Sequence, residues 1–254
     1  MTTLRVATHV HSAWSYDASW PLDRIAASFA RRGYQAVLMS EHDQGFTPDH
    51  WGEYVQACAE ASRPGLLLIP GIEYGDADNT VHVPVWGDVP FLGSGHGTLG
   101  LLERAREAGA FTVFAHPHRR DAWRRYDRRW APLLSAVEVW NRKYDGWAPN
   151  RQTLGMARGE DLPPFVALDF HTRRQFFPLG VRLEVAGPAT VPTVHDALAR
   201  GAYESMVSRL PLGVTTGAAL PALEAVEAAR RTATRAVRRV GGSRRAAPGH
   251  TDEH

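Results

Sequence analysis

The chain has 254 residues, of which 44% are hydrophobic, and its formal net charge is +2. This length fits one domain of barrel size or two small ones, with enough apolar material for a core. No apolar run reaches membrane-spanning length, and the first residues lack the basic-then-apolar pattern of a secretion signal, so we expect no membrane partner. The single cysteine, Cys58, excludes an internal disulfide and favours a cytoplasmic location.

The positive charge is unevenly distributed along the chain. Residues 220–254 hold seven arginines and four acids, whereas the first 219 residues hold 22 basic and 23 acidic side chains. Nucleic-acid-binding domains usually carry a strongly basic face. The near-neutral body therefore disfavours nucleic acid as a partner.

Short strand-like segments alternate with amphipathic helical segments. The expected strands are 4–11, 36–40, 66–73, 80–86, 111–115, 136–140, 165–168 and 179–185. The expected helices are 21–32, 48–62, 97–108, 121–133, 150–158 and 194–200. Several strands are apolar on both faces, as in a parallel sheet covered by helices. The alternation predicts an α/β fold, and the number of strands favours a (β/α) barrel.

The character of the sequence changes near residue 218, where the predicted barrel domain (1–218) ends. Residues 219–240 are rich in alanine and arginine, with apolar side chains at helical spacing, which predicts a C-terminal helix packed on the barrel. The alternative is a basic helix that contacts nucleic acid or a membrane surface, but the alanine content favours a solvated helix. Residues 241–254 are polar and contain Gly and Pro, which predicts a disordered tail.

The first strand ends in the motif His9-Val10-His11-Ser12. Alternate side chains of a strand lie on one face, so His9 and His11 project together. Two imidazoles fixed side by side on rigid backbone are the beginning of a metal site.

Further polar side chains lie near the ends of other strands. The candidates are Asp17, His42, Glu73, His82, His116, Asp169 and His171. In a (β/α) barrel the C-terminal strand ends converge on one face, so we expect all of them in one mouth. Each has a structural alternative, such as a helix cap for Asp17. A dense cluster of imidazoles and carboxylates is electrostatically unfavourable without a cation, however, and the sequence therefore predicts a metal site.

With these residues in place, the sequence resembles the PHP (polymerase and histidinol phosphatase) superfamily of metallohydrolases. The resemblance covers residues 4 to about 185 and rests on six motifs in the family's order: HVHS, SEHD, GIEYG, VHV, AHPH and LDFH. It implies a distorted (β/α)7 TIM-like barrel and a site for up to three divalent ions, manganese, zinc or iron. Histidine and carboxylate ligands suit these metals and disfavour calcium.

The resemblance also implies how the ligands are shared. One ion would take His9, His11, Glu73 and Asp169, and Glu73 would bridge to a second ion held by His82 and His116. The third ion would take Asp17, His42 and His171. Phe170, between Asp169 and His171, stands where the family usually has a small residue.

The implied activity is hydrolysis of a small-molecule phosphomonoester by metal-bound hydroxide, since a divalent ion lowers the pKa of its water. Arg119, Arg173 and Arg174 directly follow ligand motifs and are candidates for binding phosphate, because arginine makes planar bidentate contacts. Asn141, at a strand end, is a candidate for lining the mouth. His118 is a candidate for supporting a ligand or contacting substrate. Trp14 and Tyr16 suggest a stacking wall for an aromatic leaving group.

Three alternatives remain open at this point. The same metals could cleave an oligonucleotide phosphodiester, or a carbamate, amide or ester bond, and the domain could bind metals without catalysis. Only 33 residues separate His82 from His116, which leaves no room for the extra domain of some nuclease-like relatives. The complete ligand set disfavours a non-catalytic role, and no polymerase segments follow, so we expect a free-standing enzyme.

Overall fold

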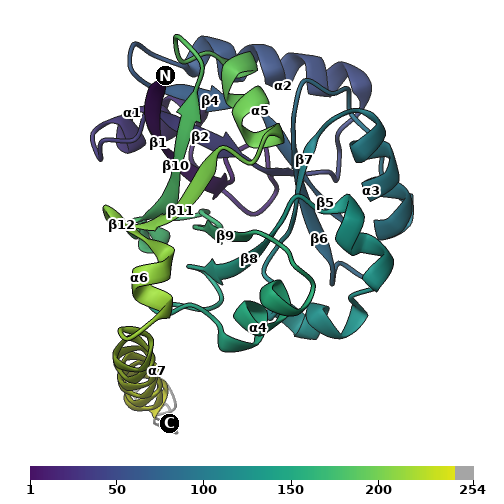
Figure 1. The fold of residues 1–254 in the computed structure, drawn as a ribbon. Helices are drawn as coiled ribbons and strands as arrows, with labels where there is room; N and C mark the ends of the chain where they lie inside the picture. The colour runs from purple at the N-terminus through teal and green to yellow at the C-terminus, as the bar shows by residue number, and fades with distance from the viewer. Residues whose placement is uncertain (244–254) are drawn as a thin grey trace, which may run out of the picture.

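The computed structural model of the protein describes residues 1–243, with side chains up to residue 236. Its strands form two six-stranded sheets, and helices lie around the outside of them (Figure 1). The first sheet contains, in spatial order, β12 (Leu210–Pro211), β11 (Tyr203–Val207), β10 (Leu179–Val185), β1 (Thr2–Val10), β2 (Ala36–Met39) and β4 (Leu67–Ile69). The second contains β3 (Glu41–His42), β5 (Gly71–Gly75), β6 (His82–Trp86), β7 (Phe111–Phe114), β8 (Ala136–Asn141) and β9 (Pro164–Ala167). The predicted α/β class is confirmed.

A closed barrel is not formed by the strands of residues 1–243, in contrast to the predicted (β/α)7 barrel. The expected strand 66–73 is divided between the two sheets at Pro70, and the expected strand 36–40 is followed after Ser40 by β3 in the other sheet, which was not expected. Proline has no N–H to donate, so a hydrogen-bonded ladder does not continue through Pro70. On the other side, β1 joins the segment after β9 through an isolated parallel bridge between Val10 and Phe170.

The sheets are mixed rather than parallel. β10 runs antiparallel to both of its neighbours, and so does β6. Because β6 is reversed, its first residue, His82, pairs with Gly75 at the end of β5. His82 therefore reaches the common edge from the start of a strand, where the sequence led us to expect strand ends.

Five of the expected helices are confirmed to within a few residues: α1 (Leu22–Ala30), α2 (Pro48–Ala61), α3 (Gly97–Glu107), α4 (Arg151–Gly159) and α5 (Val191–Ala199). The helix predicted over 121–133 is wrong. Two 3-10 helices replace it, η1 (Arg119–Arg125) and η2 (Arg128–Leu133). Arg120 and Asp121 have φ angles of 49° and 56°, a left-handed conformation that interrupts a right-handed helix. Two short helices were not expected, η3 (Arg173–Gln175) and α6 (Leu212–Thr216).

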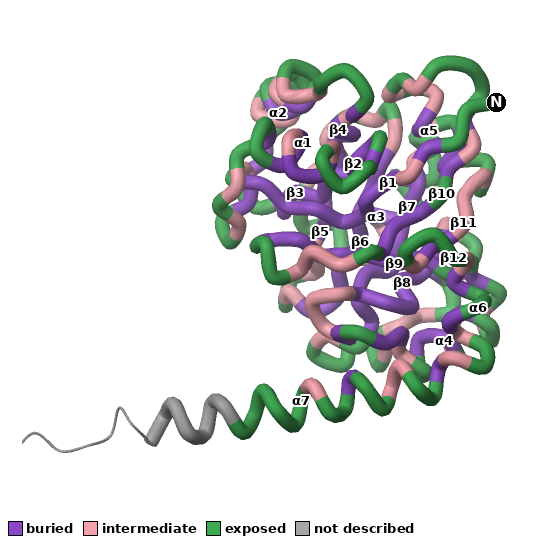
Figure 2. The backbone as a smooth tube through the Cα atoms, turned by 90° about the vertical axis from the view of Figure 1, so that its left-hand side faces the viewer, coloured by how far each residue is buried: buried purple, intermediate pink, exposed green. Residues whose placement is uncertain are grey.

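The core lies between the strands and the surrounding helices (Figure 2). One close contact in it positions β5. A Cβ atom on Gly71 would come within 2.3 Å of the Trp86 side chain and 2.6 Å of the Met39 carbonyl oxygen. The Trp86 indole N–H donates a hydrogen bond to that same carbonyl at 2.7 Å. Only glycine at position 71 lets the indole lie against β5, two residues before Glu73.

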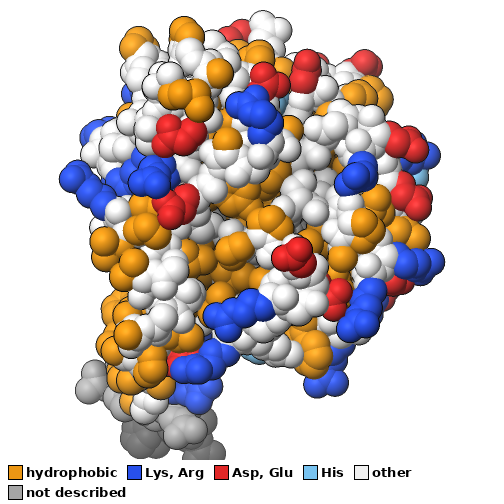
Figure 3. Space-filling model, viewed as in Figure 1, with side chains coloured by type: hydrophobic (Ala, Val, Ile, Leu, Met, Phe, Trp, Pro, Cys, Tyr) orange, Lys and Arg blue, Asp and Glu red, His pale blue; other side chains and the backbone are white. Residues whose placement is uncertain are grey.

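The last helix, α7 (Leu220–Ser243), projects away from the body (Figures 1 and 2). The predicted packing on the sheets holds only for its first part, because residues 231–236 are all exposed. Hydrophobic side chains gather over α6 and the start of α7, where Val214 and Val226 are 53% and 50% exposed (Figure 3). The helix includes the first three residues of the predicted tail, and residues 244–254 lie outside the described part. No described helix is long and apolar enough to cross a membrane.

Candidate metal centre

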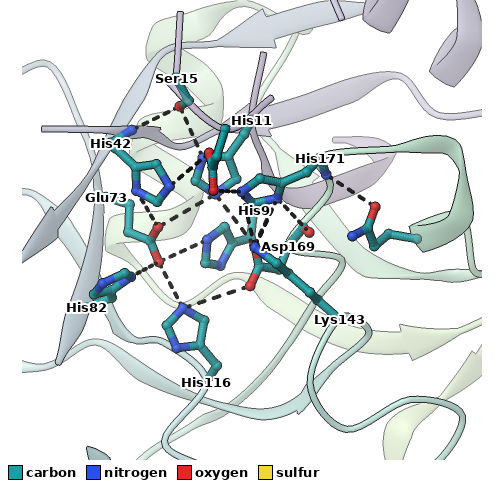
Figure 4. A network of polar contacts seen from close by, with 12 residues as sticks. His9, His11, Ser15, His42, Glu73, His82, His116, Lys143, Asp169 and His171 are labelled. Atoms are coloured by element: carbon teal, nitrogen blue, oxygen red, sulfur yellow. Dashed lines mark hydrogen bonds and ion pairs between the residues drawn. The ribbon is translucent and has the colours of Figure 1, made fainter. Parts of the chain in front are cut away.

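All nine predicted ligands lie together at one edge of the two sheets; Figure 4 draws most of them. His9, His42, Glu73 and His82 lie within β1, β3, β5 and β6, and the others are in the loops that follow β1, β7 and β9. Eight of the nine side chains are buried. The exception is Asp17, whose side chain is 34% exposed.

Glu73 lies at the centre of the cluster and is approached by five imidazoles. Its Oε1 atom is 3.1 Å from His9 Nε2 and 3.0 Å from both His82 Nδ1 and His116 Nε2. Its Oε2 atom is 3.1 Å from His42 Nδ1 and 3.6 Å from His11 Nε2. One carboxylate does not have enough lone pairs to satisfy five imidazoles directly, so the arrangement suits a carboxylate shared between cations.

Asp169 and Asp17 both contact His171, the one ligand histidine that Glu73 does not approach, and each also contacts a second histidine. Asp169 Oδ1 is 3.6 Å from His11 Nε2 and 3.3 Å from His171 Nδ1. Asp17 Oδ1 is 3.3 Å from His42 Nε2, and its Oδ2 is 3.0 Å from His171 Nε2. The carboxylates of Glu73, Asp169 and Asp17 therefore follow one another through the cluster, with imidazoles between them.

The ligand atoms form four groups whose members lie within 4.8 Å of one another. The groups are His11/Asp17/His42/His171, His9/Glu73/His116, His9/His11/Asp169 and His42/Glu73/His82. Several of the buried atoms facing inward make no hydrogen bond, although a carboxylate oxygen lies near each of the imidazole nitrogens among them: His9 Nε2, His11 Nε2, His42 Nε2, His82 Nδ1 and Asp169 Oδ2. Buried polar atoms are normally paired. These orphaned nitrogen and oxygen atoms are the donors that Mn²⁺, Zn²⁺ or Fe²⁺ would use, so the residues fit divalent ions.

Backbone strain is concentrated in the same place. His9, His116 and Asp169 have φ angles of 57°, 28° and 48° and are three of the eight described non-glycine residues with positive φ. Such a conformation costs on the order of 1–3 kcal/mol per residue and is typically retained where a functional geometry requires it. The strain at three neighbouring ligands is independent support for a functional site.

Burial and neighbouring charges shift the pKa values of several ligands. Burial raises the pKa of Glu73, but His82 and His9 outweigh it and hold that pKa well below its ordinary value. Burial likewise opposes ionisation of Asp169, yet Lys143 and His9 lower its pKa overall. The pKa of His11 is lowered by burial and by His171, which favours the neutral imidazole that binds metals.

Glu138, on β8, supports two ligands and was not predicted as a site residue. Its Oε1 atom is 2.6 Å from His9 Nδ1. Its Oε2 atom accepts hydrogen bonds from the His116 backbone N–H and from Asn141 Nδ2, both at 2.8 Å. A carboxylate on the far nitrogen fixes the tautomer and orientation of a ligating histidine, here turning His9 Nε2 towards Glu73. The signal in the sequence was an acid in the otherwise apolar strand around AVEVW.

Glu41 supports the loop that carries His11 and Asp17. It is fully buried and accepts from the Ser12 hydroxyl at 2.6 Å and from the Ser15 hydroxyl at 2.5 Å. Ser15 Oγ in turn lies 3.2 Å from His11 Nδ1. The motif SEHD therefore supplies a buried brace as well as the candidate ligand His42.

The predicted substrate contacts lie at different distances from the cluster. Arg119 is beside it: its Nη1 donates to the Asn79 carbonyl at 2.6 Å, and Asn79 Oδ1 contacts the His82 ring. Asn141 is fully buried and donates to Glu138, so its side chain braces the ligands. Arg173 and Arg174 are exposed on η3.

Two further predictions concern the surroundings of the cluster. His118 is exposed and faces a separate cavity of about 280 Å³, which is also lined by Asp145 and Arg231. Phe170 turns away from the ligands and packs against Phe176 and Trp20 at ring-centroid distances of 4.7 and 5.2 Å. Its bulk is therefore accommodated in the core.

Of the two residues of the predicted aromatic wall, Trp14 and Tyr16, only Tyr16 contacts a candidate ligand. Tyr16 is 69% exposed and stacks on the His42 ring at 5.0 Å, at the edge of the cluster. Trp14 packs instead against His50 and Tyr54, at 4.9 and 5.2 Å.

No family model matches the sequence, and no curated protein does. Solved structures do match the fold. One is a two-domain protein from Bacteroides vulgatus that contains a predicted PHP-like metal-dependent phosphoesterase. The TM-score is 0.59 at 18% identity over 81% of this chain, which spans 65% of the length of that protein. The chain therefore shares its fold with part of that protein. PsfC from Pseudomonas syringae also shares this fold, with a TM-score of 0.61 at 18% identity over 92% of this chain and 100% of PsfC.

Proposed function

We propose that the protein is a metal-dependent phosphoesterase that hydrolyses a small-molecule phosphomonoester at a centre of up to three divalent ions. The observation that carries the proposal is the single carboxylate of Glu73 within 3.6 Å of five imidazoles. The orphaned donor atoms around it and the fold shared with part of the Bacteroides vulgatus protein support the same conclusion.

The proposed ligand sets are those that the resemblance implies; the close groups of donor atoms overlap with them but place His116 with His9 and Glu73, and His82 with His42 and Glu73. His9, His11, Glu73 and Asp169 would hold one ion, and Glu73 would be shared with a second at His82 and His116. Asp17, His42 and His171 would hold a third, at the edge where Asp17 is partly exposed. Manganese, zinc and iron are the candidate metals for this combination of imidazole and carboxylate.

When bound, the ions would generate a hydroxide nucleophile at neutral pH and screen the charge of the phosphoryl group. The chain itself supplies orientation and charge. Glu138 holds the His9 ring and the His116 backbone in place, so that the ligand atoms are preorganised. Arg119 lies at the side of the cluster and would bind non-bridging phosphate oxygens.

Phosphate release by manganese-reconstituted protein tests the proposal, with Asp169→Ala as the inactive variant. Asp196→Ala removes an exposed carboxylate from α5 and is the matched control. The panel contains sugar phosphates, histidinol phosphate, nucleotides and short oligonucleotides. We expect release from a monoester by the parent and the control, and none by Asp169→Ala. Absence of release from protein that holds its metals would contradict the proposal, and esters, amides and carbamates would be tested next.

A further inference from the structure

The only lysine of the chain projects into the candidate metal centre (Figure 4). Lys143 Nζ is 3.3 Å from Asp169 Oδ1 and 3.1 Å from His171 Nε2. Its side chain is 27% exposed, whereas that of Asp169 is 2% exposed. The ammonium group therefore lies where the buried cluster opens to solvent.

The loop that carries Lys143 is held firmly on the cluster side. The Lys143 backbone N–H donates to Asn141 Oδ1 at 3.0 Å, and Asn141 in turn donates to Glu138. The ring of the next residue, Tyr144, meets the His116 ring edge-on at a centroid distance of 5.0 Å. The ammonium is thus fixed to the same support as the ligands.

Helix α7 holds the loop from the other side. Glu227 accepts from the Trp147 backbone N–H at 3.0 Å, and Arg231 donates to the Asp145 carbonyl at 2.9 Å. A Cβ atom on Gly146, whose φ is 82°, would come within 2.3 Å of Glu227 Oε1. The start of α7 therefore determines where the loop, and with it Lys143, can lie.

The charge of Lys143 has a consequence for the substrate. An ammonium that contacts two candidate ligands would be repelled once divalent ions occupy the cluster. An anionic group bound between the ammonium and the ions would relieve that repulsion. Arg119 brings a second cation to the same side, since its Nε donates to the Tyr144 hydroxyl at 3.1 Å and Lys143 Nζ lies 5.5 Å from the Tyr144 ring centroid.

We propose that Lys143 binds the phosphoryl oxygens of the substrate and, with Arg119, forms a basic clamp beside the metal centre. This inference rests on the proposed function and narrows it. A phosphomonoester carries two negative charges that match the two cations, whereas a neutral amide or ester would leave both of them unpaired. The ammonium group of lysine is compact and fits between Asp169 and His171, whereas the planar guanidinium group of arginine is larger.

Binding of inorganic phosphate to the metal-loaded protein, measured by calorimetry, tests the clamp without requiring turnover. Lys143→Met should weaken phosphate binding about 10- to 100-fold, the usual effect of losing a charge-assisted hydrogen bond. Elemental analysis should find the metals retained, and the KM for an active monoester should rise in parallel. Lys143→Arg should recover part of the affinity. Arg158→Met, which removes an exposed cation from α4, should change nothing.

The outcomes separate the clamp from the function on which it rests. If the parent binds phosphate and Lys143→Met binds it equally well, the clamp is wrong and the phosphoesterase proposal stands. If Lys143→Met loses its metals, the lysine supports Asp169 and His171 structurally, and the clamp is also wrong. If the parent neither binds phosphate nor releases it from any ester, both proposals fall.

Discussion

The two ends of the candidate metal centre, which we call its inner and outer halves, differ in enclosure and support, and His11 and Asp169 contact members of both. The inner half, which we define as His9, Glu73, His82 and His116, has side-chain exposures of 0–5%. The outer half, Asp17, His42 and His171, includes a carboxylate that is 34% exposed. A single cluster therefore combines a buried interior with an edge that solvent reaches.

The difference follows from the elements that carry the residues. Three of the inner residues lie on β1, β5 and β6, and Glu138 braces two of the four from β8. In the outer half only His42 lies on a strand, the two-residue β3, whereas Asp17 comes from the loop after β1 and His171 from the loop after β9. We expect the inner half to hold its ions tightly and the outer half to exchange them more readily, because strands fix ligand geometry better than loops do.

The largest effect is expected from the carboxylate that joins the inner half. Glu73→Gln removes the negative charge that five imidazoles share, and we expect kcat/KM to fall by about 10³-fold or more, on the order of 4 kcal/mol. Steady-state phosphate release measures this, and circular dichroism checks that the variant is folded. A variant within tenfold of the parent would show that Glu73 is not at the reaction centre.

The brace of the inner half is tested by Glu138→Gln. Glu138 accepts from the His9 ring, the His116 backbone N–H and the Asn141 amide. Glutamine keeps one acceptor oxygen, but its NH2 group cannot accept from the ring, so the His9 imidazole should lose its fixed orientation. We expect metal affinity to fall about 10- to 100-fold, the usual effect of losing such a support. Competition with a chelator measures it, and Glu103→Gln on the exposed face of α3 is the matched control. Equal affinities would mean that the inner half needs no brace.

The outer half is tested by Asp17→Asn. Removing this partly exposed carboxylate should weaken the binding of one ion. Activity should fall about tenfold as a result. Titration with manganese should find one equivalent weakened and the others unchanged. Loss of every ion would show that the two halves do not bind independently.

The smallest expected effect concerns Asp145, which lies behind the inner half. Its Oδ2 atom accepts from the Asn141 backbone N–H at 2.7 Å, and burial raises its pKa to about 7. The folded state therefore keeps a proton that an unfolded aspartate releases near pH 4. The corresponding stabilisation is complete below about pH 4 and is lost as the pH rises towards 7.

Urea unfolding between pH 4.5 and 8 measures this contribution as a difference between the parent and Asp145→Asn. The free energy of unfolding of the parent should decrease with rising pH relative to that of the variant. A constant difference across the range would mean that Asp145 is ionised throughout.

The candidate ligands could be predicted from the sequence because they lie in short motifs next to strands. Strand alternation predicted that His9 and His11 project together. The structure brings their rings to a centroid distance of 5.1 Å, but through an irregular backbone, because β1 ends at Val10 and His9 has a φ of 57°. His82 lies in the cluster for a different reason than expected, since β6 is reversed and presents its first residue at the ligand edge.

The supporting residues depend on contacts that no local pattern reveals. Glu138 meets His9 across 129 positions of sequence, and Lys143 meets His171 across 28. The helix expected over 121–133 was wrong because two left-handed residues interrupt it, and apolar spacing does not reveal such a conformation. Likewise, helical spacing predicted α7 but not that its residues 231–236 are all exposed.

The metal content of the purified protein tests the central claim most directly. Elemental analysis of the parent should find two to three equivalents of manganese, zinc or iron per chain, and Glu73→Gln should lose most of them. Removing the ions with a chelator should also lower the melting temperature of the parent, because ions that bind only the folded state stabilise it. A folded parent that binds no divalent ion, with a melting temperature unaffected by added metal, would contradict the account.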